Sequence, residues 1–264
     1  YGTGELMADA LQRGCKRVLI GLGGSATNDA GMGMLQALGF RFLDETGADT
    51  GLGGQALERV ERVDASGVMA EVREATFIAA CDVHNPLHGP EGAACIFAPQ
   101  KGATPEMVDR LDKGLHHFAE VVRLHTGTDI SSLPGAGAAG GMGGGLSAFL
   151  HADLRPGIEL VLAAADFPAL LHDASLVITG EGRADRQTLM GKVPAGILEE
   201  ARRHHVPVIL LAGQVADEAE LLQAGFKEVR GINPPSTPLS LAMCPDFARR
   251  QLTATCATAI AAFR

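Results

Sequence analysis

The chain has 264 residues, of which 46% are hydrophobic and 20% charged, which excludes a disordered polypeptide and suffices for one large or two ordinary domains. Aspartate and glutamate outnumber lysine and arginine by 31 to 22, and the net charge of −9 disfavours nucleic-acid backbones and anionic membranes as partners. Aromatic residues are only 4% and tryptophan is absent, so recognition of stacked bases is not expected.

The first part of the chain alternates short apolar segments with glycine-rich loops. Apolar residues three or four positions apart are typical of one helix face, whereas short continuous apolar runs are typical of buried strands. Thr104 and Pro105 form a strong helix start, since threonine is a favoured N-cap and proline fits the first turn. These patterns predict helices over residues 6–11, 32–38 and 105–122, and strands over residues 16–20, 40–43 and 75–80.

The last part of the chain has a simpler pattern, in which strands and helices alternate. The pattern predicts strands over residues 175–179, 206–212 and 226–232, and helices over residues 194–204 and 218–224. Such alternation is typical of a parallel sheet with helical crossovers. We therefore predict an α/β protein of two domains, residues 1–170 and residues 171–264.

A first glycine-rich motif, residues 20–33, lies between a predicted strand and a predicted helix. Backbone N–H groups in such a turn converge on phosphate oxygens, and glycine permits close approach of a ligand. Gly21, Gly23 and Ala26 also fit G-x-G-x-x-A, a loose dinucleotide fingerprint with Asp44 as its acidic residue. A tight turn that binds nothing is the alternative. The candidate nucleotide ligands of this motif are Gly23, Gly24, Ser25, Asn28 and Asp29.

Two further segments carry candidate ligands. Asp82 and Asn85 follow the third predicted strand, at the strand end where α/β enzymes bind their ligands, and Lys101 offers a compact cation for phosphate. An Asx turn before Pro86 is the alternative, and the nearby histidines lack a third ligand at metal spacing, which disfavours zinc. Residues 134–145 form a second glycine-rich stretch, which suits a phosphate or ribose loop or close backbone packing. Its candidate ligands are Gly137, Gly140 and Gly141.

A fourth motif, residues 177–192, gathers opposite charges after a predicted buried strand. Glu181 and Asp185 are carboxylates of the kind that bind Mg²⁺ together with phosphate oxygens, and Lys192 can neutralise a phosphate. A solvated cluster of surface charges is the alternative. The sequence contains no G-x-x-x-x-G-K-[ST], H-R-D or G-x-S-x-G pattern, which disfavours a P-loop enzyme, a protein kinase and an α/β-hydrolase.

Taken together, these motifs resemble those of the bacterial type I glycerate kinase family. The resemblance implies a Rossmann-like α/β domain with a parallel sheet, split along the chain, and a mixed α/β domain inserted into it. Residues 1–170 would be the inserted domain, and residues 171–264 the C-terminal half of the split domain. Family members are longer at the N-terminus, so the chain is expected to be truncated, with the first part of the split domain missing. The matching stretches occur in the family's order at residues 20–35, 80–103, 134–150, 157–161 and 176–196.

The resemblance also implies a reaction, the phosphorylation of glycerate to 2-phosphoglycerate with ATP and Mg²⁺. Phosphoryl transfer depends mainly on positioning and on charge neutralisation. The resemblance implies that Glu181 and Asp185 hold Mg²⁺, and that Asp185 or Asp82 orients the glycerate hydroxyl. Lys192 and Lys101 would balance phosphate charge. Arg183 would hold the glycerate carboxylate as a planar fork.

Two alternatives from other classes stay open: an NAD-dependent oxidoreductase, based on the dinucleotide fingerprint, and a truncated fragment that binds a ligand without turnover. The five cysteines form no C-x-x-C pair and predict buried thiols in a reducing, cytoplasmic compartment. No apolar run approaches the about 18 residues that span a bilayer, so no membrane partner is expected. Apolar surface left by the missing strands would favour a homo-oligomer.

Overall fold

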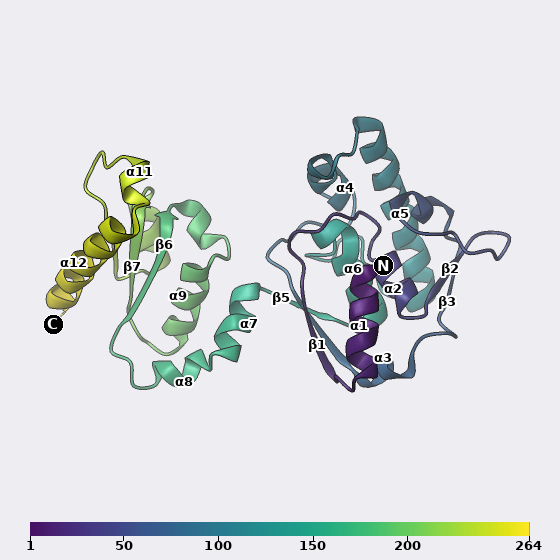
Figure 1. Cartoon of the computed structure of the whole chain (residues 1–264), viewed down its shortest axis with the longest axis horizontal. Coiled ribbons are helices and arrows are strands. Elements are labelled where there is room, and N and C mark those ends of the chain that lie inside the picture. Colours follow the sequence, from purple (N-terminus) through teal and green to yellow (C-terminus); the bar gives the residue numbers. More distant parts are fainter. Residues whose placement is uncertain (264) are drawn as a thin grey trace. The chain divides into compact units, whose positions relative to one another are not determined.

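The computed structural model describes residues 1–263 and divides into two compact units, Tyr1–Gly157 and the segment from Ile158 onward (Figure 1). This division falls earlier than the boundary predicted at residue 170. The reason is that α7 (Gly157–Ala164) and α8 (Phe167–Leu171) belong to the second unit, where Phe167 and Leu171 pack into its core.

The first unit contains a three-stranded parallel sheet with the strand order β1-β4-β5 and an antiparallel pair, β2-β3. Its strands are β1 (Arg17–Gly21), β2 (Arg41–Leu43), β3 (Arg62–Asp64), β4 (Thr76–Ala80) and β5 (Asp153–Arg155). Its α-helices are α1 (Gly2–Gln12), α2 (Met32–Ala37), α3 (Ala70–Glu74), α4 (Ala93–Phe97), α5 (Pro105–Thr126) and α6 (Ala138–Leu150), and its 3₁₀ helices are η1 (Gly54–Arg59) and η2 (Pro99–Lys101).

Local signals predict about half of the elements of the first unit, and β3, α3, α4 and β5 were not predicted from the sequence. The predicted strands at residues 16–20, 40–43 and 75–80 correspond to β1, β2 and β4. Helix α5 begins where predicted, because the Thr104 side chain accepts a hydrogen bond from the Met107 N–H at 3.3 Å. The prediction that β1 is buried is wrong in part: β1 is an edge strand among the described residues, and Leu19 is 62% exposed.

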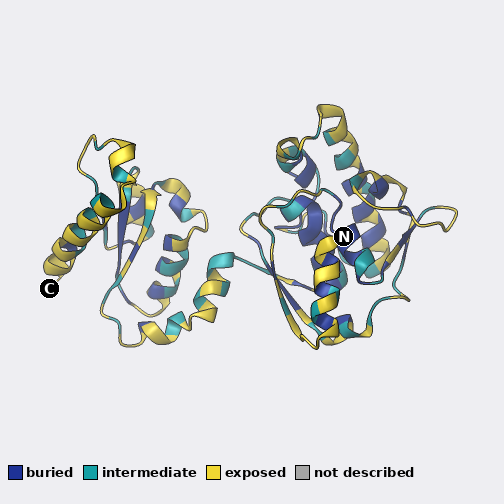
Figure 2. Cartoon of the chain, viewed as in Figure 1, coloured by how far each residue is buried: buried dark blue, intermediate teal, exposed yellow. Residues whose placement is uncertain are grey.

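The second glycine-rich stretch is only partly a loop, and the difference has a steric reason. Residues 142–150 are helical, and they form most of α6, which is largely buried (Figure 2). A Cβ on Gly143 would overlap the carbonyl oxygen of Gly135, and one on Gly145 would overlap that of Ala30. Glycine normally weakens a helix, so this close approach of α6 to neighbouring backbone explains why glycine is present.

The second unit contains a parallel sheet with the strand order β6-β7-β8, which confirms the predicted sheet with helical crossovers. Alternate residues of β7 pack on opposite faces: Leu210 joins the core formed with Leu198 and Leu221, whereas Leu211 contacts the cluster of Ala259. Helix α12 is exposed along most of its length (Figure 2). The remaining elements are β6 (Val177–Ala184), β7 (Val208–Val215), β8 (Glu228–Gly231), η3 (Arg186–Leu189), α9 (Val193–Arg203), α10 (Glu218–Ala224), α11 (Leu239–Ala242) and α12 (Pro245–Phe263).

The cysteines are free thiols, but the prediction of burial holds for Cys81 only, since Cys15 and Cys244 are exposed in the turns that follow α1 and α11. Within residues 1–263, no helix has both the length and the apolar character that crossing a membrane requires.

Candidate functional site

The first glycine-rich motif forms an open loop between β1 and α2. A Cβ on Gly23 or Gly24 would meet no other atom within 4 Å. Gly24 has a positive φ of 67°, so glycine is favoured there by the backbone alone. Gly23 has no such conformation, and nothing within the described structure requires it to be glycine. A ligand that approaches the backbone closely would supply that requirement.

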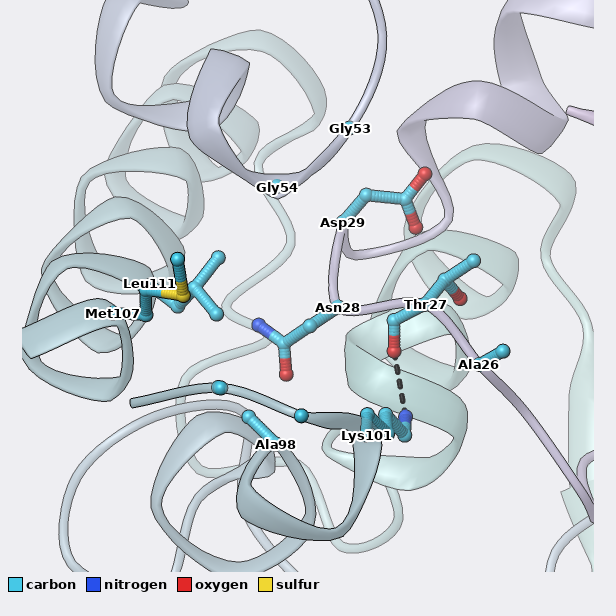
Figure 3. A pocket seen from close by; sticks show the side chains of 12 residues that line it. Ala26, Thr27, Asn28, Asp29, Gly53, Gly54, Ala98, Lys101, Met107 and Leu111 are labelled. Carbon is cyan, nitrogen blue, oxygen red and sulfur yellow. Dashed lines mark hydrogen bonds between the residues drawn. The ribbon is translucent and has the colours of Figure 1, made fainter. Parts of the chain in front are cut away.

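Lys101 brings a cation to this loop from the end of η2. Its ammonium group donates a hydrogen bond to Ser25 Oγ at 2.9 Å. It donates another to the Thr27 carbonyl oxygen at 2.6 Å, which Figure 3 shows. Burial lowers the pKa of Lys101, and the nearby Asp29 carboxylate partly opposes that effect. A partly buried cation beside an open glycine-rich loop is suited to phosphate.

Two cavities share Lys101. The larger, of about 360 Å³, is an open pocket lined by the loop residues Ala26 to Asp29, by Gly53 and Gly54, and by side chains of α5 (Figure 3). The smaller, of about 190 Å³, is lined by Gly24 and Ser25 among others. The structure therefore places five predicted ligands around two cavities of the first unit: Gly24, Ser25, Asn28, Asp29 and Lys101.

Asp29 has a structural task in this loop. It is only 5% exposed, and its two carboxylate oxygens accept hydrogen bonds from the N–H groups of Gly31 and Gly33, each at 3.1 Å. These bonds satisfy backbone donors at the start of α2, as an N-capping carboxylate does. Its assignment as a nucleotide ligand stays a prediction.

The three glycines predicted from the second motif pack against other backbone. A Cβ on Gly137 would overlap the carbonyl of Pro86, one on Gly140 would overlap that of Thr27, and one on Gly141 would lie 2.9 Å from the Ala30 Cα. Gly140 also accepts a hydrogen bond from the Ala30 N–H at 3.0 Å. Close packing therefore explains why these positions are glycine. Their role as nucleotide ligands stays a prediction.

The candidates after β4 are held by hydrogen bonds to neighbouring segments. Asn85 Nδ2 donates to the Glu91 carbonyl at 2.8 Å. The backbone carbonyl of Asn85 accepts from the Gly137 N–H at 3.0 Å. Asp82 Oδ1 accepts from the N–H of Gly157, the first residue of α7, at 2.8 Å. Asp82 is exposed, so its carboxylate remains accessible to solvent.

The dinucleotide fingerprint does not have the structural context that such a site needs. Its acidic residue, Asp44, follows β2, but β2 pairs with β3 and is not part of the sheet that contains β1. Asp44 Oδ1 also accepts hydrogen bonds from the N–H and hydroxyl of Thr46 and from the Ala48 N–H, at 2.9, 2.7 and 3.0 Å. Asp44 is thus part of its own turn, and the oxidoreductase alternative loses its support.

In the second unit, Glu181 is the centre of the charged motif. Strand β6 is longer than predicted, because its pairing with β7 continues to Ala184, so Glu181 lies on the strand rather than in a loop. Its side chain is 15% exposed and contacts the Lys192 ammonium at 3.5 Å. The Thr188 hydroxyl donates to Glu181 Oε1 at 2.5 Å.

Asp185 lies at the end of this strand and caps η3. Its carboxylate accepts from the Gln187 N–H at 3.0 Å, and its own N–H donates to the Thr188 hydroxyl at 3.0 Å. Arg183, whose side chain is 65% exposed, has its Nε 3.3 Å from Asp185 Oδ2. The Thr188 hydroxyl therefore links the Glu181 carboxylate to the backbone N–H of Asp185. Within residues 1–263, no three His, Cys, Asp or Glu side chains lie together as a metal site.

Comparison with known proteins decides the family. The sequence matches the model of the Glycerate kinase family over residues 1–264. The chain belongs to the glycerate kinase family. The resemblance inferred from the motifs is thereby confirmed.

Relatives in this family are similar over most of the chain. Glycerate kinase of Bacillus subtilis (strain 168) is 48% identical over 239 residues, which cover 90% of this chain and 63% of the relative. Glycerate 2-kinase of Escherichia coli (strain K12) is 48% identical over 217 residues, covering 82% and 57%. The chain thus spans about three fifths of these curated relatives. A crystal structure of a provisionally named glycerate kinase 2 from Salmonella typhimurium LT2 is 45% identical, with a TM-score of 0.82 over 99% of this chain and 69% of that one. The predicted two-domain α/β class is consistent with this neighbour.

Sequence reasoning missed several residues of the candidate site in this glycerate kinase family member. Thr188 is fully buried and links Glu181 to Asp185. The D-x-x-T spacing from Asp185 to Thr188 is a helix-start signal that would have found it. Met107 and Leu111 line the larger cavity, but their helical spacing indicates only a buried face. Their position at a ligand cavity depends on tertiary packing.

Proposed function

We propose that the protein phosphorylates glycerate, transferring the γ-phosphoryl group of ATP to a hydroxyl group and yielding 2-phosphoglycerate and ADP. Membership of the glycerate kinase family supports this class of reaction. The main structural support for a nucleotide site is Lys101, a partly buried ammonium group held beside an open glycine loop. That combination binds the phosphates of a nucleotide through charge and through backbone N–H donors.

The first unit supports nucleotide binding in this proposal. Gly23 and Gly24 leave open space in which phosphate oxygens can approach the backbone, and Ser25 adds a hydroxyl group. Lys101 neutralises phosphate charge where water is partly excluded, so its attraction for an anion is stronger than that of an exposed lysine. Asp29 holds the loop in shape through its bonds to Gly31 and Gly33.

The second unit supplies the carboxylates of the proposal. Glu181 and Asp185 would hold an Mg²⁺ ion that arrives with the nucleotide, because Mg²⁺ is commonly bound by one or two carboxylates together with phosphate oxygens and water. When bound, Mg²⁺ would neutralise and orient the phosphates. Asp185 would accept the proton of the attacking hydroxyl, with Asp82 as the alternative base. Lys192 would balance phosphate charge, and Arg183 would bind the carboxylate of glycerate as a planar fork.

Glycerate-dependent release of ADP tests the proposal. A coupled assay should show ADP release only when glycerate, ATP and Mg²⁺ are all present, and ³¹P NMR should identify the product as 2-phosphoglycerate. ADP release that does not depend on glycerate would contradict the proposed substrate. Titration of NAD in place of ATP serves as the control for the rejected oxidoreductase, and NAD binding without ATP binding would overturn the kinase proposal.

A further inference from the structure

The amide group of Asn28 is unusual among the polar groups of the first unit. Its nitrogen and its oxygen are both buried, and neither has a hydrogen-bond partner among the described residues. Buried polar groups are almost always paired, and an unpaired one lowers stability. A side chain with one unpaired donor and one unpaired acceptor side by side is a candidate for hydrogen bonds from a ligand.

The amide faces the larger of the two cavities. It projects into the space between Leu111 of α5, Ala98 and Lys101 (Figure 3). The volume of about 360 Å³ lies in the range of roughly 300–1,000 Å³ that small-molecule sites have. Met107 and Leu111 form an apolar wall on one side, and Ala98 and Ala103 add apolar surface from the segment around η2.

The lining indicates the chemical class of the occupant. Apolar walls suit a flat heterocycle, which covers them with its two faces. An asparagine amide pairs with adenine through two hydrogen bonds, donating to a ring nitrogen and accepting from the exocyclic amine. The corresponding edge of guanine presents two acceptors and cannot make both bonds. Glycerate, with three polar substituents on three carbons, would leave the apolar walls uncovered.

The surroundings of the cavity agree with a nucleotide. Lys101 lines this cavity and also the smaller one, where Gly24 and Ser25 offer backbone and hydroxyl groups to phosphate. A nucleotide joins a flat base to an anionic chain, so one molecule can satisfy both environments. We propose that the cavity beside Asn28 is the adenine subsite, in which the amide of Asn28 selects adenine over guanine. This inference rests on the nucleotide-dependent function proposed above.

Adenosine and tripolyphosphate, used as separate probes, test the subsite without turnover. Isothermal titration should show adenosine binding to the wild-type protein, and Asn28→Leu should weaken it about tenfold or more, because leucine keeps the size and removes both hydrogen bonds. Tripolyphosphate binding should be unchanged in the variant. The melting temperature of the ligand-free variant should rise, because an unpaired buried amide is replaced by an apolar group. A merely structural Asn28 predicts the opposite, a lower melting temperature with normal adenosine binding.

Gln36 provides the matched control. Its amide oxygen is also buried without a partner, but Gln36 does not line the cavity. Gln36→Leu should therefore leave adenosine affinity unchanged, and an equal loss in both variants would overturn the proposal. In the wild-type protein, adenosine should shift the ¹³C-methyl signal of Met107, and guanosine should not. This measurement decides the question even where Asn28→Leu does not fold.

The outcomes separate this inference from the proposed function. Adenosine binding that depends on Asn28, in a protein without glycerate-dependent ADP release, would support the subsite and contradict the glycerate kinase reaction. Glycerate-dependent ADP release with equal use of ATP and GTP would support the reaction and overturn the selection of adenine by Asn28.

Discussion

The same substitution at two glycines distinguishes a glycine required by packing from one required by a ligand. Gly140 has a positive φ of 70°, and a Cβ there would overlap the Thr27 carbonyl oxygen. Gly23, in the open loop, has no positive φ, and a Cβ there would meet nothing within 4 Å. Gly140→Ala should therefore destabilise the protein, whereas Gly23→Ala should leave its stability intact and weaken nucleotide binding.

The magnitudes follow from these two environments. For Gly140→Ala, the left-handed backbone costs about 1–2 kcal/mol and the overlap with backbone about 1–3 kcal/mol, so the free energy of unfolding should fall by about 2–5 kcal/mol. In a domain of this size, that corresponds to a drop in melting temperature of roughly 4–20 °C. For Gly23→Ala, the reduced freedom of the unfolded chain adds about 0.4–1 kcal/mol of stability. Its nucleotide affinity should fall about tenfold or more, or ~1.4 kcal/mol.

Differential scanning calorimetry and isothermal titration with ATP and Mg²⁺ measure the two effects in parallel. An unchanged melting temperature for Gly140→Ala would refute the argument that α6 and its leading turn need glycine for close packing. Normal ATP affinity in a stable Gly23→Ala variant would refute the assignment of this loop to phosphate.

The remaining predictions concern charges. Asp185→Asn keeps an acceptor for the Gln187 N–H, so the melting temperature should hardly change while ADP release falls about 100-fold or more; normal turnover would move the base role to Asp82. Glu181→Gln keeps an acceptor for Thr188 but loses its charge, so half-maximal activity should need more Mg²⁺, and an unaltered Mg²⁺ titration would remove Glu181 from the metal site. Burial lowers the pKa of Lys101 below 10.5, and only its protonated form attracts phosphate, so ATP affinity should be lost as pH rises through that lowered pKa. Arginine stays charged there, so Lys101→Arg should abolish this alkaline loss in titrations across pH, and a loss that persists in the variant would exclude Lys101 as its source.

Local sequence signals by themselves determined about half of the elements, and they determined the family. Thr104 with Pro105 marks the start of α5 because capping depends only on neighbouring residues. The alternating apolar segments after residue 171 predicted the parallel sheet β6-β7-β8. They did so because the spacing of apolar residues differs between a strand and a helix. The order of four motifs was sufficient to identify the glycerate kinase family, which the family comparison confirmed.

Only the tertiary structure decided what the glycines and the polar groups contact. Gly23 and Gly140 look alike in sequence, but one lies in open space and the other against the Thr27 carbonyl, because α6 folds back onto the first loop. Asn28 also differs from its neighbour: its amide is unpaired in a cavity formed with α5 and η2, whereas the Asp29 carboxylate accepts from Gly31 and Gly33 within its own loop. The surroundings of Gly140 and Asn28 arise from contacts between segments far apart in the chain, and local patterns carry no record of such contacts.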